Sequence, residues 1–255
     1  MPEQKVDQPV EKIVDAASQA VRAESEPAPV RRYRAVLFQG GLIIVAVTFA
    51  VLTFLVKTMP SFSIDLQITK TIQEINFPPF AWLMSLISWP GFSPQSTIIT
   101  TLIILLIFGL GLHWEAVMAL TAAVFSTAIN VLVKDLIQRP RPTAGAVNVI
   151  DILNSYSFPS GHVMYYLGFY GFVAFLAFSL LKPSIKRSVI MWIIGVFIGL
   201  VGVSRIYLGE HCASDVLGAY LLGSLTLVAI IQFYIWGKTR FLVHQPVAAA
   251  KPQKT

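Results

Sequence analysis

Long runs of apolar residues without a charged side chain dominate this sequence. The first, residues 35–56, is long enough to cross a bilayer as an α-helix. The same pattern predicts five further membrane-spanning helices, over residues 95–112, 116–137, 161–181, 188–207 and 212–236. The sequence therefore predicts an all-α integral membrane bundle of six transmembrane helices.

Two shorter helices are expected between the first two spans. Residues 57–74 are mixed in polarity, and isoleucines recur at helical spacing at Ile64, Ile68, Ile72 and Ile75, which predicts an amphipathic helix along the membrane surface. Residues 75–112 carry no charge, but Trp82, Trp89 and Pro90 interrupt them early. This pattern predicts an interfacial helix over 79–89, because tryptophan is enriched at the membrane–water boundary.

The spans divide the chain into three parts. Residues 1–34 form a polar tail in which Val10, Ile13 and Val14 recur at helical spacing, so a short amphipathic surface helix and a disordered tail both stay open. The six-span domain covers residues 35–237, and a polar C-terminal tail covers residues 238–255.

Composition agrees with a membrane protein and excludes other classes. Of 255 residues, 55% are hydrophobic and 13% are charged, whereas soluble domains carry about a quarter charged residues. The net charge is +6, but no Lys/Arg-rich block alternates with aromatic residues, so no nucleic-acid partner is expected. The single cysteine, Cys212, excludes an internal disulfide and a cysteine-based metal cluster.

Basic residues orient the six spans. Eight of them flank span ends on one side, before the first span, between the fourth and fifth, and after the sixth, at Arg31, Arg32, Arg34, Lys182, Lys186, Arg187, Lys238 and Arg240. By the positive-inside rule this side is cytoplasmic, so both termini are expected in the cytoplasm. The compact six-span form suggests a bacterial inner membrane. Apart from Lys57 and Lys70, the basic residues on the opposite side lie in the motif-bearing loops, at Lys134, Arg139, Arg141 and Arg205, which indicates a function for cations there.

Residues 204–215 place ionisable groups between two apolar runs, where they are costly and usually functional. His211 and Asp215 are four residues apart, which puts both on one face if the following helix begins near Cys212 or earlier. A carboxylate there holds one imidazole nitrogen as N–H and leaves the other free as a nucleophile or base.

Two further motifs contain residues that could bind an anion. Lys134 ends the third span and Arg141 follows on a proline-stiffened loop, so both could reach one phosphate, although basic residues also end membrane spans without binding anything. Ser160 is a suitable N-cap for the fourth span, Gly161 lets a ligand approach the backbone, and His162 follows. That tetrapeptide alone is also ordinary turn chemistry. All three motifs lie at non-cytoplasmic span ends and together predict a phosphate site.

The combination Lys134-x6-Arg141-Pro142, Pro159-Ser160-Gly161-His162 and Ser204-Arg205-x5-His211-x3-Asp215 resembles the three-part signature of the type-2 phosphatidic acid phosphatase superfamily. The resemblance implies that His211 attacks phosphorus, Asp215 holds its tautomer and His162 protonates the leaving oxygen. It also implies that Lys134, Arg141, Ser160, Gly161 and Arg205 bind the phosphoryl oxygens. Glu210, Cys212 and Ala213 are unusual between the fixed positions, which bears on substrate preference.

The resemblance implies a membrane enzyme that hydrolyses the phosphate or diphosphate of a lipid substrate through a phosphohistidine, with no metal and no cofactor. A lipid phosphotransferase using the same histidine stays open, because the motifs do not encode the acceptor. An anion transporter or scaffold is the alternative from another class, although no inverted repeat is present. The motifs leave open which lipid is bound and the oligomeric state.

Overall fold

The computed structural model describes residues 28–59, 61–143, 145–150 and 153–242. The chain forms two units, residues 1–45 and 46–255, and helix α2 (Ala28–Thr58) begins in the first and ends in the second. This helix starts upstream of the expected residue 35. The surface helix considered for the N-terminal tail lies outside the described residues.

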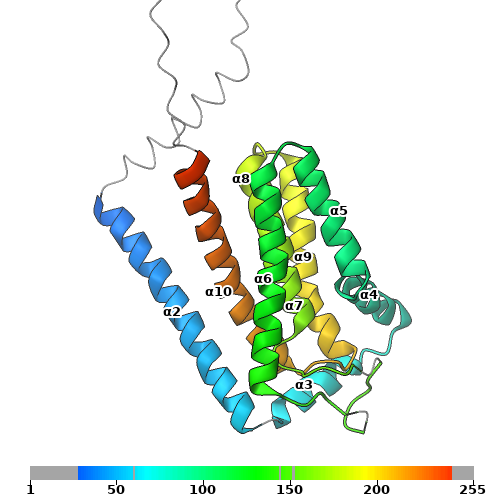
Figure 1. Cartoon of the computed structure of the whole chain (residues 1–255). Coiled ribbons are helices and arrows are strands. Elements are labelled where there is room, and N and C mark those ends of the chain that lie inside the picture. Colours follow the sequence, from blue (N-terminus) through cyan, green and yellow to red (C-terminus); the bar gives the residue numbers. More distant parts are fainter. Residues whose placement is uncertain (1–27, 60, 144, 151–152, 243–255) are drawn as a thin grey trace, which may run out of the picture. The chain divides into compact units, whose positions relative to one another are not determined.

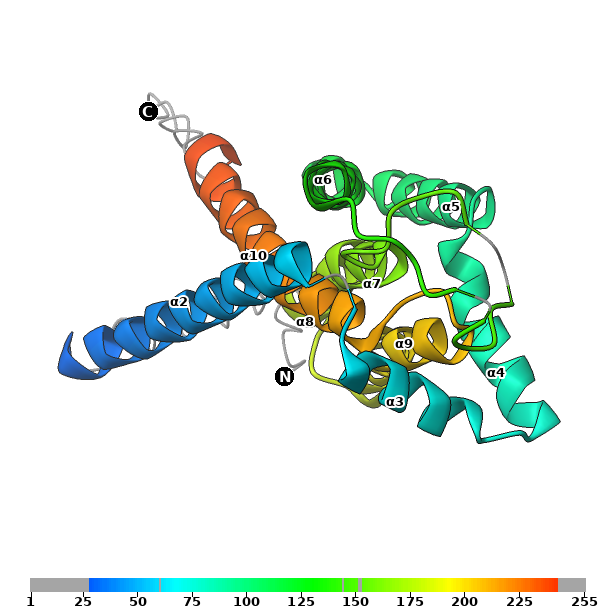
Figure 2. The same cartoon turned by 90° about the horizontal axis from the view of Figure 1, so that it is seen from below.

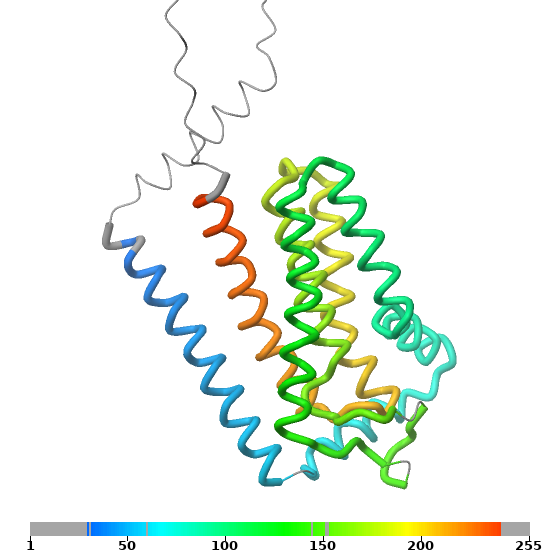
Figure 3. Tube along the Cα trace, viewed as in Figure 1, coloured from blue at the N-terminus to red at the C-terminus, as the bar shows by residue number. Residues whose placement is uncertain are grey.

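The described residues contain helices and no strand, which confirms the all-α prediction. After α2 the helices are α3 (Ser63–Gln73), α4 (Pro78–Ser88), η1 (Trp89–Gly91), α5 (Gln95–Gly109), α6 (His113–Ile137), α7 (Gly161–Tyr165), η2 (Tyr166–Tyr170), α8 (Gly171–Leu180), α9 (Ile185–Tyr207), α10 (Ala213–Gly237) and η3 (Lys238–Leu242). Within residues 46–255, α6, α8, α9 and α10 run alongside one another (Figures 1 and 3).

Five helical stretches in the described chain are long and apolar enough to cross a membrane: Arg32–Thr58, His113–Ile137, Gly161–Leu180, Ile185–Tyr207 and Ala213–Arg240. They match the first, third, fourth, fifth and sixth predicted spans. Large side chains stay exposed along them, such as Val124 at 59% and Trp192 at 74%, as expected for surfaces that face lipid.

The second predicted span needs a correction. Helix α5 ends at Gly109 and has 15 residues, about 22 Å at 1.5 Å per residue, which is less than a hydrocarbon core of about 30 Å. Helices α4 and α5 meet the criteria for a span only together, and they are bent by 61° at the break between them. The stretch that contains the second predicted span is therefore a bent pair of helices, with Pro90 and Pro94 near the bend.

Helix α3 forms where the isoleucine pattern predicted a helix, but a different face is buried. Its buried residues are Asp65 and Thr69, whereas Ile64 is 57% exposed. Ile68 and Ile72 are only partly buried against the core. The reason lies in the partners of Asp65, which are buried polar groups of α10 and of the loop after α6, described below.

One apolar cluster supports the end of the bundle where the motifs lie. It joins α4, α7, η2, α9 and α10 through Met84, Ile87, Val163, Met164, Tyr166, Val201, Ile206, Val216 and Ala219. A second cluster lies around Met118, Phe172 and Tyr234, among α6, α8 and α10. Figure 2 views the bundle from the end where the motifs lie, at which α3 and the loops between the spans gather.

Close packing fixes the first two motifs against each other. Asn130 of α6 donates its side-chain N–H to the carbonyl of Pro159 at 3.0 Å. A Cβ on Gly168, in the π-helical turn η2, would overlap the side chain of Ser126 on α6, so the two backbones approach closely there. The start of α7 is thereby fixed beside the end of α6.

Candidate active site

The structure brings His211 and Asp215 together. His211 lies in the loop between α9 and α10 and is 1% exposed, and Asp215 in the first turn of α10 is fully buried. The distance from His211 Nδ1 to Asp215 Oδ2 is 3.7 Å, which is too long for a direct hydrogen bond. Ser157 bridges the two, because its Oγ lies 2.6 Å from that carboxylate oxygen and 3.4 Å from Nδ1.

The Ser157 hydroxyl has one proton, which it donates to the Asp215 carboxylate. It can therefore only accept from His211, which favours the tautomer with the proton on Nδ1. The other ring nitrogen, Nε2, faces the Arg141 guanidinium at 3.4 Å. The lone pair of His211 thus points toward a cation of the first motif.

Burial keeps His211 neutral. Removal from water lowers the pKa of His211 to about 3, and the nearby charges of Arg141 and Arg205 act in the same direction, while Asp215 opposes them. The imidazole is therefore uncharged at neutral pH and can act as a nucleophile or base.

The Asp215 carboxylate is held on every side. One oxygen accepts from Arg139 Nη1 at 2.6 Å, and the other accepts from Ser157 and from the backbone N–H of Cys212 at 2.8 Å. Burial opposes the charge on Arg139, but Asp215 and Asp65 outweigh it and raise the pKa of that guanidinium. Arg139, which the sequence indicated only as a cation on the unexpected side, is thus a buried partner of the carboxylate.

The two cations of the first motif converge on the loop that precedes the second. Lys134 Nζ donates to the carbonyl of Tyr156, and Arg141 Nη2 reaches the same oxygen at 3.5 Å. Arg141 also donates to the carbonyl of Ser155 at 2.7 Å and to that of Glu210 at 2.6 Å. Carbonyl oxygens thus occupy the donors that the sequence predicted for a phosphate.

Arg205 is paired inside the protein. Its fully buried guanidinium forms an ion pair with Glu210, which is also fully buried, and donates to Ser88 Oγ. The same guanidinium lies 5.0 Å from the centre of the Phe92 ring. Glu210, which the sequence marked as unusual, therefore balances the cation expected to bind phosphate.

The second motif has unpaired polar atoms. Ser160 is at the N-cap of α7, but its hydroxyl makes no capping bond, so the expected side-chain cap is absent. Ser160 Oγ and His162 Nε2 are buried and lack a hydrogen-bond partner among the described residues. Such atoms are uncommon in native structures and call for an explanation, of which a ligand is one. The His162 ring packs edge-on against Phe92 at 4.5 Å.

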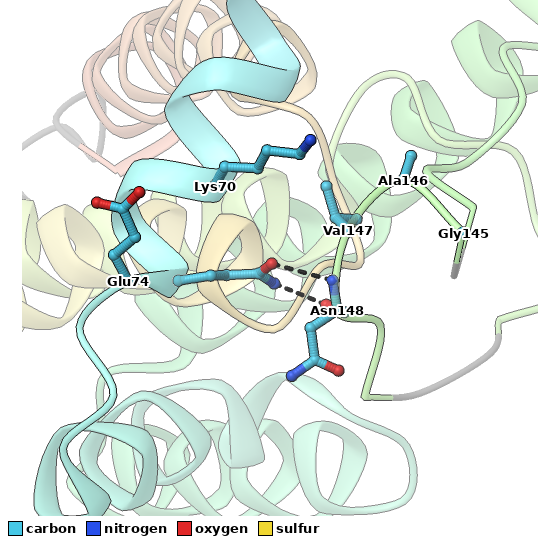
Figure 4. A pocket seen from close by; sticks show the side chains of 7 residues that line it. Lys70, Glu74, Gly145, Ala146, Val147 and Asn148 are labelled. Atoms are coloured by element: carbon cyan, nitrogen blue, oxygen red, sulfur yellow. Dashed lines mark hydrogen bonds between the residues drawn. The ribbon is translucent and has the colours of Figure 1, made fainter.

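Two grooves reach Arg141. One of about 560 Å³ lies between α3 and the loop after α6 and includes Asp65, Pro142 and Cys212. The other, of about 580 Å³, includes Lys134 and Asp135 of α6 and Ser155 and Tyr156 of the following loop. A third groove of about 620 Å³, shown in Figure 4, lies beside Lys70 and Asn148 and contains none of the predicted site residues.

Comparison with known proteins identifies the family. The profile of the PAP2 superfamily matches residues 115–238, which include all three motifs. Phosphatidylglycerophosphatase B of Bacillus subtilis (strain 168) is 30% identical over 190 residues, which cover 72% of this chain and 90% of that protein. This chain belongs to the PAP2 superfamily. The predicted resemblance is thereby confirmed.

Other similar proteins extend the comparison. Dolichyldiphosphatase 1 of Rhinolophus ferrumequinum is 29% identical over 172 residues, covering 64% of this chain and 70% of that protein. The crystal structure of the Bacillus subtilis transmembrane PAP2-type phosphatidylglycerolphosphate phosphatase has a TM-score of 0.69 at 30% identity and covers 78% of this chain and 98% of that one. Aquifex aeolicus LpxE, at 19% identity, has a TM-score of 0.55 and covers 68% of this chain and 98% of that one, which supports the fold alone. The multi-pass membrane fold is therefore confirmed.

The sequence did not single out Ser157 or Asp65. Ser157 precedes the second motif by two residues, and nothing in the sequence distinguishes it from other serines in loops. Asp65 lies on a helix whose pattern is set by isoleucines. Only the folded chain shows that both contact the groups around Asp215.

Proposed function

We propose that this PAP2 protein hydrolyses the phosphate or diphosphate ester of a membrane lipid through a phosphohistidine on His211, without a metal ion. The observation that carries this proposal is the environment of His211. Its Nδ1 faces Ser157 and Asp215 while its Nε2 faces Arg141, and the ring is buried and neutral.

In the first step, Nε2 of His211 attacks phosphorus and the bond from phosphorus to the lipid oxygen breaks. His162 donates a proton to that oxygen, so the lipid leaves as a neutral alcohol, or as a lipid phosphate when the substrate is a diphosphate. The imidazole becomes positively charged as the new P–N bond forms. The buried Asp215 carboxylate, 3.7 Å from the ring, stabilises that charge.

In the second step, His162 takes a proton from water and the resulting hydroxide attacks the phosphorus. The P–N bond breaks, inorganic phosphate leaves and His211 returns to its neutral form. The unpaired His162 Nε2 supports this role, because a buried ring nitrogen without a partner is available for proton transfer.

Lys134, Arg141 and Arg205, with the Ser160 hydroxyl and the Gly161 N–H, are proposed to hold the phosphoryl oxygens and to stabilise the charge of the transition state. The structure pairs these cations with the carbonyls of Ser155, Tyr156 and Glu210 and with the Glu210 carboxylate. A phosphate would replace these weaker acceptors with charged oxygens, which bind guanidinium and ammonium more strongly.

The relatives support a lipid substrate. They are named for action on phosphatidylglycerophosphate and dolichyl diphosphate. The motifs of this chain lie at one end of its spans, so a head group could bind there while its chains stay in the bilayer. The basic-residue pattern supports placing this end outside the cytoplasm of a bacterial inner membrane, with both termini inside.

Phosphate release by the detergent-purified protein tests the proposal. Phosphatidate, phosphatidylglycerophosphate and undecaprenyl diphosphate are compared with EDTA present, each alongside His211→Ala. We expect release from at least one lipid that EDTA does not reduce and that His211→Ala abolishes. Turnover only after addition of a divalent metal contradicts metal independence, and no release from any lipid contradicts the hydrolase. Transfer to an added lipid alcohol in place of water would indicate a phosphotransferase.

A further inference from the structure

A carboxylate outside the three motifs is bound to the groups that hold Asp215. Asp65 is on α3 and is 4% exposed. Its Oδ1 accepts the backbone N–H of Ser214 at 2.8 Å. Its Oδ2 accepts from the Ser214 hydroxyl at 2.5 Å and from Arg139 Nη2 at 2.9 Å. All of these partners lie next to Asp215, either in sequence or through a hydrogen bond.

Arg139 connects the two carboxylates. Its Nη2 donates to Asp65, and its Nη1 donates to Asp215 Oδ1 at 2.6 Å and to Ser214 Oγ at 2.6 Å. The Ser214 hydroxyl accepts from Arg139 and donates its one proton to Asp65, so this buried network is closed. A planar guanidinium can hold two carboxylates in fixed positions in this way, which a lysine ammonium cannot.

The net charge of this network favours a positive charge on His211. With Asp65 present, the two carboxylates and one guanidinium sum to one negative charge beside His211. Without Asp65, the guanidinium and Asp215 sum to zero, and the charge that would stabilise a positively charged imidazole is cancelled. All three side chains are almost completely removed from water, so solvent screens these interactions little.

We propose that Asp65 is a positioning residue for phosphoryl transfer: through Arg139 it fixes the Asp215 carboxylate and leaves that carboxylate its full charge toward His211. The inference rests on the proposed function, because it assigns Asp65 to the step in which His211 becomes positively charged. It also explains why α3 buries an aspartate in place of its isoleucines.

Another role for Asp65 would be simply to anchor α3, and the chain offers a matched control. Gln73, at the other end of α3, donates to the carbonyls of Asn148 at 2.6 Å and Tyr207 at 2.9 Å. Its Oε1 accepts the Asn148 N–H at 3.0 Å. Gln73 therefore anchors the same helix through Asn148 and Tyr207, which are not members of the Asp65–Arg139–Asp215 network.

The experiment compares Asp65→Asn, Arg139→Lys and Gln73→Ala with the wild type in detergent, on the lipid that the wild type hydrolyses best. We expect kcat to fall about tenfold to a hundredfold in Asp65→Asn and Arg139→Lys, as it does when a hydrogen-bonded partner that orients a metal-bound residue is removed. Inhibition by inorganic phosphate should not change in these variants, because Asp65 does not contact the proposed phosphate donors. Gln73→Ala should retain the wild-type kcat.

Two results overturn the inference while the proposed function stands. The first is an active wild type with unchanged kcat in folded Asp65→Asn or Arg139→Lys. The second is an equal loss of kcat in Asp65→Asn and Gln73→Ala, which would make Asp65 an anchor of α3. If Asp65→Asn does not fold, the kcat of Arg139→Lys decides the question, because Arg139 is the partner through which Asp65 acts. A wild type without phosphatase activity overturns the proposed function instead.

Discussion

Replacing Asp215 by asparagine tests the electrostatic core of the proposed mechanism. The substitution keeps the size of the side chain and removes its charge. Two unit charges separated by the 3.7 Å between His211 Nδ1 and Asp215 Oδ2 interact by about 4 kcal/mol at an effective dielectric constant of about 20. If the imidazole charge develops fully, loss of this interaction lowers kcat by about a thousandfold.

The assay is phosphate release at saturating lipid with EDTA present, and folding is checked by thermal unfolding in the same detergent. The Asp215→Asn fold should persist, because Arg139 keeps its hydrogen bond to Asp65. Glu74→Gln is the control, since Glu74 is an exposed carboxylate of the groove in Figure 4. A folded Asp215→Asn protein with a kcat within about tenfold of the wild type would refute the reasoning.

Three further predictions follow from the same structure. Arg141→Lys should weaken inhibition by inorganic phosphate about tenfold or more, because an ammonium cannot replace a guanidinium fork at phosphate; equal inhibition constants would contradict this. Because the pKa of His211 is lowered in the folded protein, the unfolded chain binds a proton at a higher pH than the folded chain does. The free energy of unfolding should therefore fall as pH drops from about 6.5 toward 3. His211→Ala should weaken this pH dependence when it is measured by chemical unfolding. Gly168→Ala should lower stability by about 1–3 kcal/mol, because its Cβ would overlap Ser126, whereas Gly195→Ala, which has open space, should not; equal unfolding midpoints would refute the packing argument.

The membrane fold could be predicted because an uninterrupted run of apolar residues indicates each span. Five of the six predicted spans appear in the described chain as continuous helical stretches near their predicted positions. The break between α4 and α5 could not be placed, because a charge-free stretch with prolines is compatible with one bent span or with two separate helices. Near the bend, α4 packs against α9 and Phe92 contacts His162, and neither contact can be read from the local pattern.

The candidate site was predictable only in part. Histidine, carboxylate and basic residues at fixed spacing indicated the motif positions, since these residue types are costly near hydrocarbon. Ser157 and Asp65 carry no such signal, because their roles depend on contacts across 58 and 149 residues of sequence. The ion pair between Arg205 and Glu210 could not be predicted either, since spacing alone does not tell whether a carboxylate pairs with a cation or faces solvent.

The most direct test of the central claim is to trap the phosphoryl group on the protein. Wild type and His211→Ala are mixed briefly with a lipid substrate labelled in its terminal phosphate and are then quenched in base, where phosphohistidine survives. The proposed mechanism predicts label on the wild-type protein that is stable in base, lost in acid and located at His211, and no label on His211→Ala. Rapid phosphate release by the wild type with no trapped label, or an equally labelled His211→Ala protein, would contradict a phosphohistidine on His211.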